Sequence, residues 1–69
     1  MKIQLDIADA IQIAVALSRA AYNAIKVAEE FPDNDILVEA SERKFALMNG
    51  FRKEIGLDTL TVEALKEKF

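Results

Sequence analysis

Residues 7–28 read IADAIQIAVALSRAAYNAIKVA, and this stretch decides the fold. On a helical period of about 3.6 residues, its polar side chains fall on one narrow stripe, and apolar or small residues occupy nearly every other position. A surface helix usually buries an arc of about 100°, whereas a helix that is apolar nearly all round is buried nearly all round. The polar stripe consists of Asp9, Gln12, Arg19, Asn23, Lys26 and Glu30.

The chain is too short to cover such a helix by itself. It has 69 residues, and a folded chain of this size buries only about 60% of the surface that its unfolded form exposes. Cysteine and histidine are absent, so neither a disulfide nor the usual zinc ligands can add stability. We therefore predict a homo-oligomer, a dimer or larger, in which copies cover each other as a helical bundle. The predicted self-association residues are Ile11, Val15, Leu17 and Ile25.

The first helix is expected over about residues 6–31. Asp6 is a good N-cap residue. Pro32 ends the helix because the residue before a proline is pushed out of the α region. The residues after it, Pro32-Asp33-Asn34-Asp35, have the composition of a turn, and Asp33 or Asn34 can cap the next helix. So short a connection makes the two helices antiparallel neighbours.

The second helix is expected over about 34–55 and the third over about 61–69. Gly56 suits the position after a helix end, where φ is often positive. Thr61 is placed to cap the third helix, and Leu60 and Leu65 have the spacing of a hydrophobic staple. The sequence therefore predicts an all-α single domain over 1–69, an antiparallel helical hairpin with a short C-terminal helix.

The residues before the first helix alternate in polarity. Ile3 and Leu5 alternate with Lys2 and Gln4, which is the period of a strand. Two interpretations remain open, an extended lead-in to the first helix and a strand that pairs between subunits.

Charge and hydropathy argue against nucleic acid and membranes as partners. The net charge is −3, whereas phosphate backbones and anionic lipids attract positive charge. The longest uncharged run in the first helix, Ala10 to Ser18, is far short of the ~20 residues that cross a bilayer. Asp6 and Asp9 stand where a secretory leader is basic. We expect a soluble, cytoplasmic protein.

Two short patterns bear on catalysis and metal binding. Ser41 and Lys44 match S-x-x-K, in which a lysine activates a serine nucleophile, but the further motifs that such enzymes need are missing. Asp33 and Asp35 open like a calcium loop, yet apolar residues follow where further ligands belong. We predict no catalysis, no cofactor and no bound metal.

Several polar side chains are candidates for contact with a partner. Lys44 and Arg52 fall within the apolar half of the second helix. They either extend along a core margin to reach water or line a groove between subunits with Ser41 and bind a small anionic ligand. Tyr22 suits an interface because one end of its ring can pack while the other stays wet. The predicted contact residues are Arg19, Tyr22, Asn23, Lys26, Lys44 and Arg52.

Residues 51–65, FRKEIGLDTLTVEAL, resemble the turn region of a helix-turn-helix. In that family two helices meet at a short turn, often with glycine, and the second helix enters the major groove of DNA. The resemblance implies a DNA-binding regulator. The segment departs from the family in two respects, since Arg52 stands where a small residue is usual and Glu63 and Glu67 repel phosphates.

These observations favour a non-catalytic interaction protein. We expect a homo-oligomer that regulates or inhibits a macromolecular partner, in the first place another protein. The alternatives are the DNA-binding regulator and an oligomer that holds a small anionic ligand between subunits. Val15→Asp and Leu17→Asp should each dissociate or unfold the protein, whereas Arg19→Ala should leave folding intact.

Overall fold

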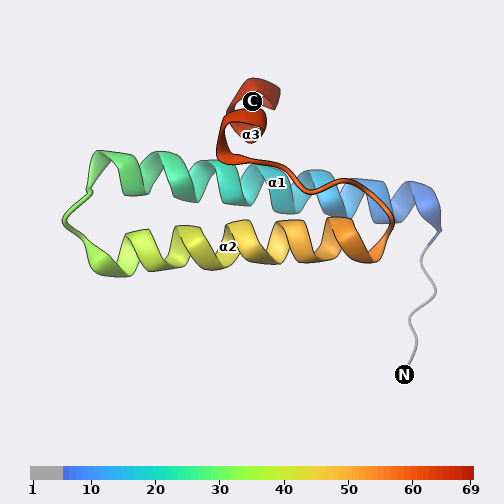
Figure 1. Cartoon of the computed structure of the whole chain (residues 1–69), viewed down its shortest axis with the longest axis horizontal. Coiled ribbons are helices and arrows are strands. Elements are labelled where there is room, and N and C mark those ends of the chain that lie inside the picture. Colours follow the sequence, from blue (N-terminus) through green and yellow to red (C-terminus); the bar gives the residue numbers. More distant parts are fainter. Residues whose placement is uncertain (1–5) are drawn as a thin grey trace.

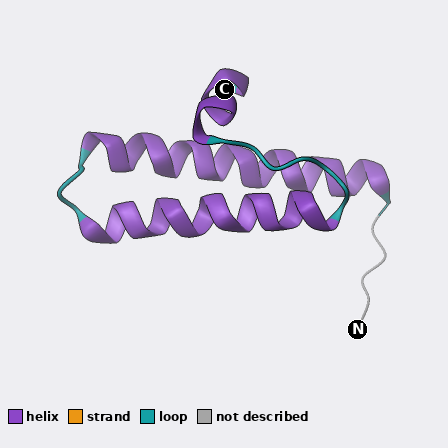
Figure 2. Ribbon diagram, in the orientation of Figure 1, coloured by secondary structure: helices purple, strands orange, loops and turns teal. Residues whose placement is uncertain are grey.

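The computed structural model describes residues 6–69, and this part of the chain is helical with no strand. The helices are α1 (Ile7–Glu30), α2 (Asp35–Glu54) and α3 (Val62–Lys68) (Figures 1 and 2). Helices α1 and α2 pack as an antiparallel hairpin, and α3 lies across α1 (Figure 1). The predicted all-α hairpin is confirmed, with each bound within one residue of its expected position. The strand considered for residues 2–5 lies outside the described residues.

Side chains cap two of the three helices. At the start of α2, Asn34 Oδ1 accepts a hydrogen bond from the Leu37 N–H at 3.2 Å. At the start of α3, Thr61 Oγ1 accepts one from the Ala64 N–H at 3.1 Å. Asp6 has the extended backbone of an N-cap, but its side chain makes no capping hydrogen bond. The choice left open between Asp33 and Asn34 is therefore settled in favour of Asn34.

The end of α2 confirms the predicted glycine stop. Gly56 has a φ of 85°, a conformation that costs other residues steric strain. Its N–H donates to Lys53 O at 3.2 Å, and the Leu57 N–H donates to Arg52 O at 2.8 Å. This pair of hydrogen bonds is a Schellman motif, which satisfies the last carbonyl groups of the helix and turns the chain back.

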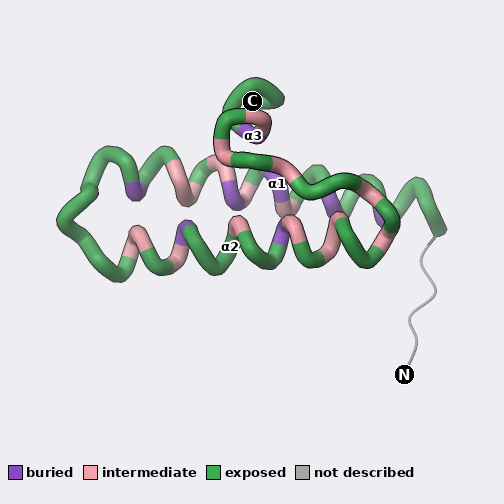
Figure 3. The backbone as a smooth tube through the Cα atoms, viewed as in Figure 1, coloured by how far each residue is buried: buried purple, intermediate pink, exposed green. Residues whose placement is uncertain are grey.

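Small side chains fill the seam between α1 and α2. The buried positions of the two helices face each other (Figure 3), and on α1 they are almost all alanine: Ala10, Ala14, Ala21 and Ala28. The buried hydroxyl groups of Ser18 and Ser41 donate to carbonyl oxygens one turn earlier in their own helices. Within residues 6–69, no buried side-chain nitrogen or oxygen lacks a hydrogen bond. Because alanine and serine side chains are small, the contact between α1 and α2 buries little apolar surface.

The larger core lies where α3 crosses the hairpin. Ala21, Met48 and Leu65 form it, one residue from each helix. The half-buried side chains around them are Leu17, Tyr22, Ile25, Phe45 and Leu60. Leu60 and Leu65 thus meet in one cluster, in agreement with the predicted staple. Of the described residues, only Met48 and Leu65 are large side chains that are fully buried.

The connection between α2 and α3 runs back over α1 and is held by two side chains of α2 (Figure 1). Asn49 forms two hydrogen bonds with the backbone of Leu60. Arg52 Nε donates to Asp58 O at 2.6 Å. The connection is therefore fixed to α2, while α3 itself packs on α1.

Hydropathy gives no indication of a bilayer crossing in this fold. Over residues 6–69, none of the helices combines the length and the apolar content that a membrane span requires.

Candidate interaction surfaces

Large apolar side chains remain exposed over much of the described chain. Ile36 is 79% exposed, Ile7 75% and Leu47 60%. Single exposed apolar side chains are ordinary, and it is their grouping on one surface that indicates a binding role. The full set is Ile7, Ile11, Ile13, Val15, Val27, Phe31, Ile36, Leu47 and Phe69.

One apolar surface lies along both long helices, and we call it the groove face. A hollow of about 430 Å³ occupies its centre and is lined by residues of α1 and α2. The lining residues are Ala20, Asn23, Ala24, Val27, Leu37, Ala40 and Lys44. We add four residues that stand seven positions before or after a lining residue, and so lie on the same side of its helix. On α1 these are Ile13 and Ala16, and on α2 they are Leu47 and Phe51. The lining residues and these four make up the groove face.

The groove face lies on the side of the hairpin away from α3. Val27 and Glu29 are two residues apart, which places them on nearly opposite sides of α1. Glu29 forms an ion pair with Lys66 of α3, so Val27 and the hollow lie on the far side. Packing of α3 therefore leaves the groove face uncovered.

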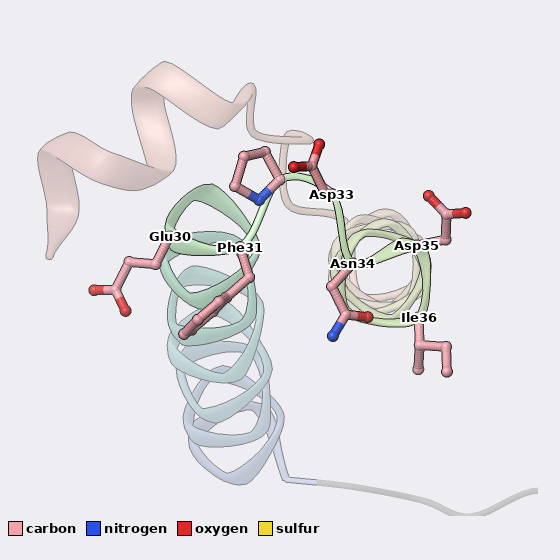
Figure 4. Close-up of a pocket in the computed structure, with 7 residues that line it drawn as sticks. Glu30, Phe31, Asp33, Asn34, Asp35 and Ile36 are labelled. Carbon is pink, nitrogen blue, oxygen red and sulfur yellow. The ribbon is translucent and has the colours of Figure 1, made fainter.

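The turn extends this apolar surface at one end of the hairpin. A second hollow is lined by residues 30–36 (Figure 4). Its two large apolar side chains, Phe31 and Ile36, point away from α3, whereas Asp33 points toward the opposite side (Figure 4). Phe31 and Ile36 thus add apolar surface at this end of the hairpin, although Glu30, Asp33 and Asp35 line the same hollow.

A second surface lies at the junction of α1 and α3. Arg19, Tyr22, Asn23, Lys68 and Phe69 line a hollow of about 410 Å³ there. The guanidinium carbon of Arg19 lies 5.6 Å from the centroid of the Phe69 ring. The rings of Tyr22 and Phe69 have centroids 5.6 Å apart.

Cationic and apolar side chains continue this surface in both directions along α1. Lys26 Nζ lies 5.9 Å from the centroid of the Tyr22 ring. In the other direction, Val15 and Ile11 precede Arg19 by one and two helical turns and are about half exposed. We call the whole set the Arg19 surface: Ile11, Val15, Arg19, Tyr22, Lys26 and Phe69.

The structure separates the predicted partner-contact residues into three places. Arg19, Tyr22 and Lys26 belong to the Arg19 surface, and Asn23 lies between the two surfaces and lines both hollows. Lys44 lines the groove face. Arg52 is two turns further along α2 and holds the connection to α3 instead.

The grouping considered for a small anionic ligand is not assembled. Lys44 lines the hollow of the groove face, whereas Arg52 donates to Asp58 O. The Ser41 hydroxyl is buried and donates to Val38 O at 2.6 Å. These three side chains therefore have separate surroundings.

The predicted self-association residues also divide. Leu17 and Ile25 pack against the core of the single chain. Ile11 and Val15 remain exposed, at 46% and 50%. Only the second pair is available for contact with another molecule in this fold.

The arrangement of α2 and α3 differs from a helix-turn-helix. Residues 55–61 separate the two helices, and α3 packs on α1. The motif needs two helices that meet at a turn of three or four residues. In residues 51–65, the features that resemble a helix-turn-helix are the Gly56 stop of α2 and the Thr61 cap of α3.

Sequence reasoning missed Asn49 and the groove face. The hydrogen bonds of Asn49 carry no sequence signal, because a single amide in a helix forms no pattern that reveals a partner eleven residues away. The groove face does carry a signal, since Ile13, Ala20 and Val27 recur every seven residues. The strong polar stripe on the neighbouring side of α1 obscured it.

Acidic side chains do not gather into a metal site in the part of the chain described. Among residues 6–69, no group of three or more aspartate, glutamate, cysteine or histidine side chains lies close enough together to hold an ion.

Comparison of the chain with models of known families, with curated proteins and with solved structures finds no match.

Proposed function

We propose that this chain is a non-catalytic helical protein that self-associates and regulates or inhibits a protein partner by binding it. The observation that carries the proposal is the imbalance between exposed and buried apolar side chains in residues 6–69. Nine large ones are exposed, whereas two are fully buried. Contact with other chains would remove this apolar surface from water, at a gain of about 25 cal/mol per Å².

The two surfaces suit different tasks. The groove face is long and mostly apolar, with Lys44 as the one charged side chain of its central hollow and Arg43 and Glu54 beside Leu47 and Phe51 at its edge. An apolar centre with a polar rim is the character of a subunit interface. The Arg19 surface combines two cations with two aromatic rings. Arginine and tyrosine are enriched at the residues that dominate binding energy in protein complexes. We therefore assign the Arg19 surface to the partner, which would offer carboxylates to Arg19 and Lys26.

Sedimentation equilibrium tests the self-association. The monomer mass is 7.7 kDa. At micromolar concentration we expect twice this mass or a larger whole multiple. A mass of 7.7 kDa for a fully helical sample at that concentration would overturn the proposal.

Cross-linking in extracts of the source cells tests the partner. A partner that binds the Arg19 surface should be captured by the wild-type chain and lost with Arg19→Glu. Lys53→Glu is the matched control, because it makes the same charge change at an exposed position of α2. Equal capture by both variants would show that the Arg19 surface is not the binding site.

A further inference from the structure

We propose that a second copy of this chain covers the groove face, with α2 of each copy packed against α1 of the other. The two-fold axis runs parallel to the helices, and the result is a four-helix bundle. The inference rests on the proposed self-association and adds the surface and the pairing of the helices.

The spacing of the groove face is that of a helix-packing seam. On α2, Leu37, Lys44 and Phe51 are seven residues apart, and Ala40 and Leu47 follow three residues after the first two. Alternating steps of three and four residues keep a stripe turned toward one neighbouring helix. Within the chain, α2 turns Ser41 and Met48 toward α1, and the stripe is the row beside them, in which Lys44 and Leu47 are exposed and Leu37, Ala40 and Phe51 are half-buried. The exposed side chains of this row are left for a helix from another molecule.

Side-chain size decides which helix lies opposite which. On α1 the middle of the stripe has the small residues Ala16, Ala20 and Ala24, and Ile13 and Val27 lie toward its ends. On α2 the stripe has the larger residues Leu37, Leu47 and Phe51. Two α2 helices in contact would place large side chains against large ones. Two α1 helices would leave space between alanines. Only α2 against α1 of the other copy sets large side chains into small ones, as close packing requires.

The position of Lys44 supports the same pairing. Lys44 lies near the middle of α2, so antiparallel packing of α2 on its own copy would bring two ammonium groups together. Like charges that lose water are strongly unfavourable. A two-fold axis parallel to the helices preserves heights along the bundle. The two Lys44 residues then lie at one level, but on diagonally opposite helices that are not packed directly against each other. Lys44 is then level with Asn23 of the second copy, because both already line one hollow in the single chain. The amide oxygen of Asn23 can accept a hydrogen bond from the ammonium group.

The area is sufficient for a specific dimer. Helix α2 has 20 residues, which is about 30 Å at 1.5 Å per residue. A face about 30 Å long and two helices wide, each about 10 Å across, covers ~600 Å² on each copy and ~1,200 Å² in total. Specific interfaces begin at about this size.

Charge excludes the Arg19 surface as the dimer contact. A two-fold dimer places identical patches against each other. Arg19 and Lys26 would then face their own copies, together with Lys68, which lines the same hollow as Arg19. The groove face carries one cation in place of three.

Disulfide cross-linking between two single variants tests the pairing, and the absence of natural cysteine makes each engineered thiol unique. Ala24→Cys and Ala40→Cys line the same hollow at the same height on α1 and α2. The two full-length variants are purified separately and mixed under mild oxidation. We expect the mixed disulfide to form at least tenfold faster than either homodimeric disulfide. A faster Ala40→Cys homodimer would overturn the pairing in favour of α2 on α2.

Val15→Cys, on the Arg19 surface, is the control for the choice of face. It should remain a free thiol, and a rapid Val15→Cys disulfide would overturn the groove face as the interface. An oligomer in which none of the variants forms a disulfide would also overturn it. A monomer mass for the wild-type chain would instead overturn the proposed self-association, so the two failures are distinguishable.

A pair of charge substitutions provides a second measurement. Leu47 and Val15 are both at least half exposed in the single chain, at 60% and 50%, so aspartate at either position leaves the helices intact. Leu47→Asp should weaken the dimer by more than a hundredfold, since it buries an unpaired charge. Val15→Asp should leave the dissociation constant within about threefold. The reverse order, measured by sedimentation with helicity checked by circular dichroism, would overturn the proposal.

Discussion

The side-chain amide of Asn49 binds both polar backbone groups of Leu60. Its Nδ2 donates to Leu60 O at 2.9 Å, and its Oδ1 accepts from the Leu60 N–H at 2.7 Å. One residue of α2 thereby satisfies both backbone groups of the half-buried Leu60 and sets where Leu60 packs against the core.

Replacement of Asn49 should loosen this connection. Asn49→Ala leaves the N–H and the C=O of Leu60 without partners, and each unsatisfied group costs about 1–3 kcal/mol if it stays out of water. We expect a loss of about 2 kcal/mol in the free energy of unfolding, measured by urea denaturation. Gln12→Ala, in the exposed polar stripe of α1, is the control and should change stability by less than about 0.5 kcal/mol. Equal effects would show that the clamp adds nothing to stability.

The two glycines should respond to alanine in opposite directions. Apart from the adjoining backbone, neither has an atom within 4 Å of the place where a Cβ would stand, so clashes with packed side chains play no part. Gly56 has a positive φ, and alanine there should cost about 1 kcal/mol. Gly50 lies inside α2 with ordinary helical backbone, and alanine there should gain about 0.5–1 kcal/mol. A pair of melting curves with shifts of the same sign would contradict this assignment.

Aspartate at positions 15 and 17 should have different outcomes. The sequence alone predicted that both variants dissociate or unfold, but Leu17 packs against the core and Val15 is half exposed. Leu17→Asp should therefore lower the melting temperature strongly, because it places a charge in a half-buried position against the core of Ala21, Met48 and Leu65. Val15→Asp should keep a melting temperature within a few degrees of the wild type. A Leu17→Asp protein that melts at the wild-type temperature would show that the core is not where the structure has it.

Arg19→Ala should leave the fold intact and test the cation–π contact with Phe69. An exposed contact of this kind contributes about 0.5–1 kcal/mol at most, so we expect the unfolding midpoint in urea to fall only slightly. Loss of more than about 2 kcal/mol would mean that Arg19 supports the docking of α3 through more than this ring. The variant also tests partner binding, since it removes the cation and preserves the helix.

The helices were predictable because each boundary has a local cause. Pro32, Gly56 and Thr61 act through the backbone of their immediate neighbours, and the structure places each helix end within one residue of expectation. The same locality explains what was missed. The hydrogen bonds of Asn49 and Arg52 depend on where the chain returns after Gly56, which no periodicity encodes. Leu17 and Ile25 were assigned to self-association because an apolar helix does not reveal which side its own chain will cover.

The short third helix has a consequence for the order in which the molecule folds. Helix α3 has seven residues, far fewer than an isolated helix needs to be stable in water. Its ion pair joins Lys66 to Glu29, 37 positions earlier, whereas the hairpin joins two consecutive helices through the short turn of residues 31–34 and can close outward from that turn. Contacts near in sequence form first, so the hairpin assembles before α3 docks. Amide hydrogens of α3 should accordingly exchange with solvent sooner than those of the hairpin seam.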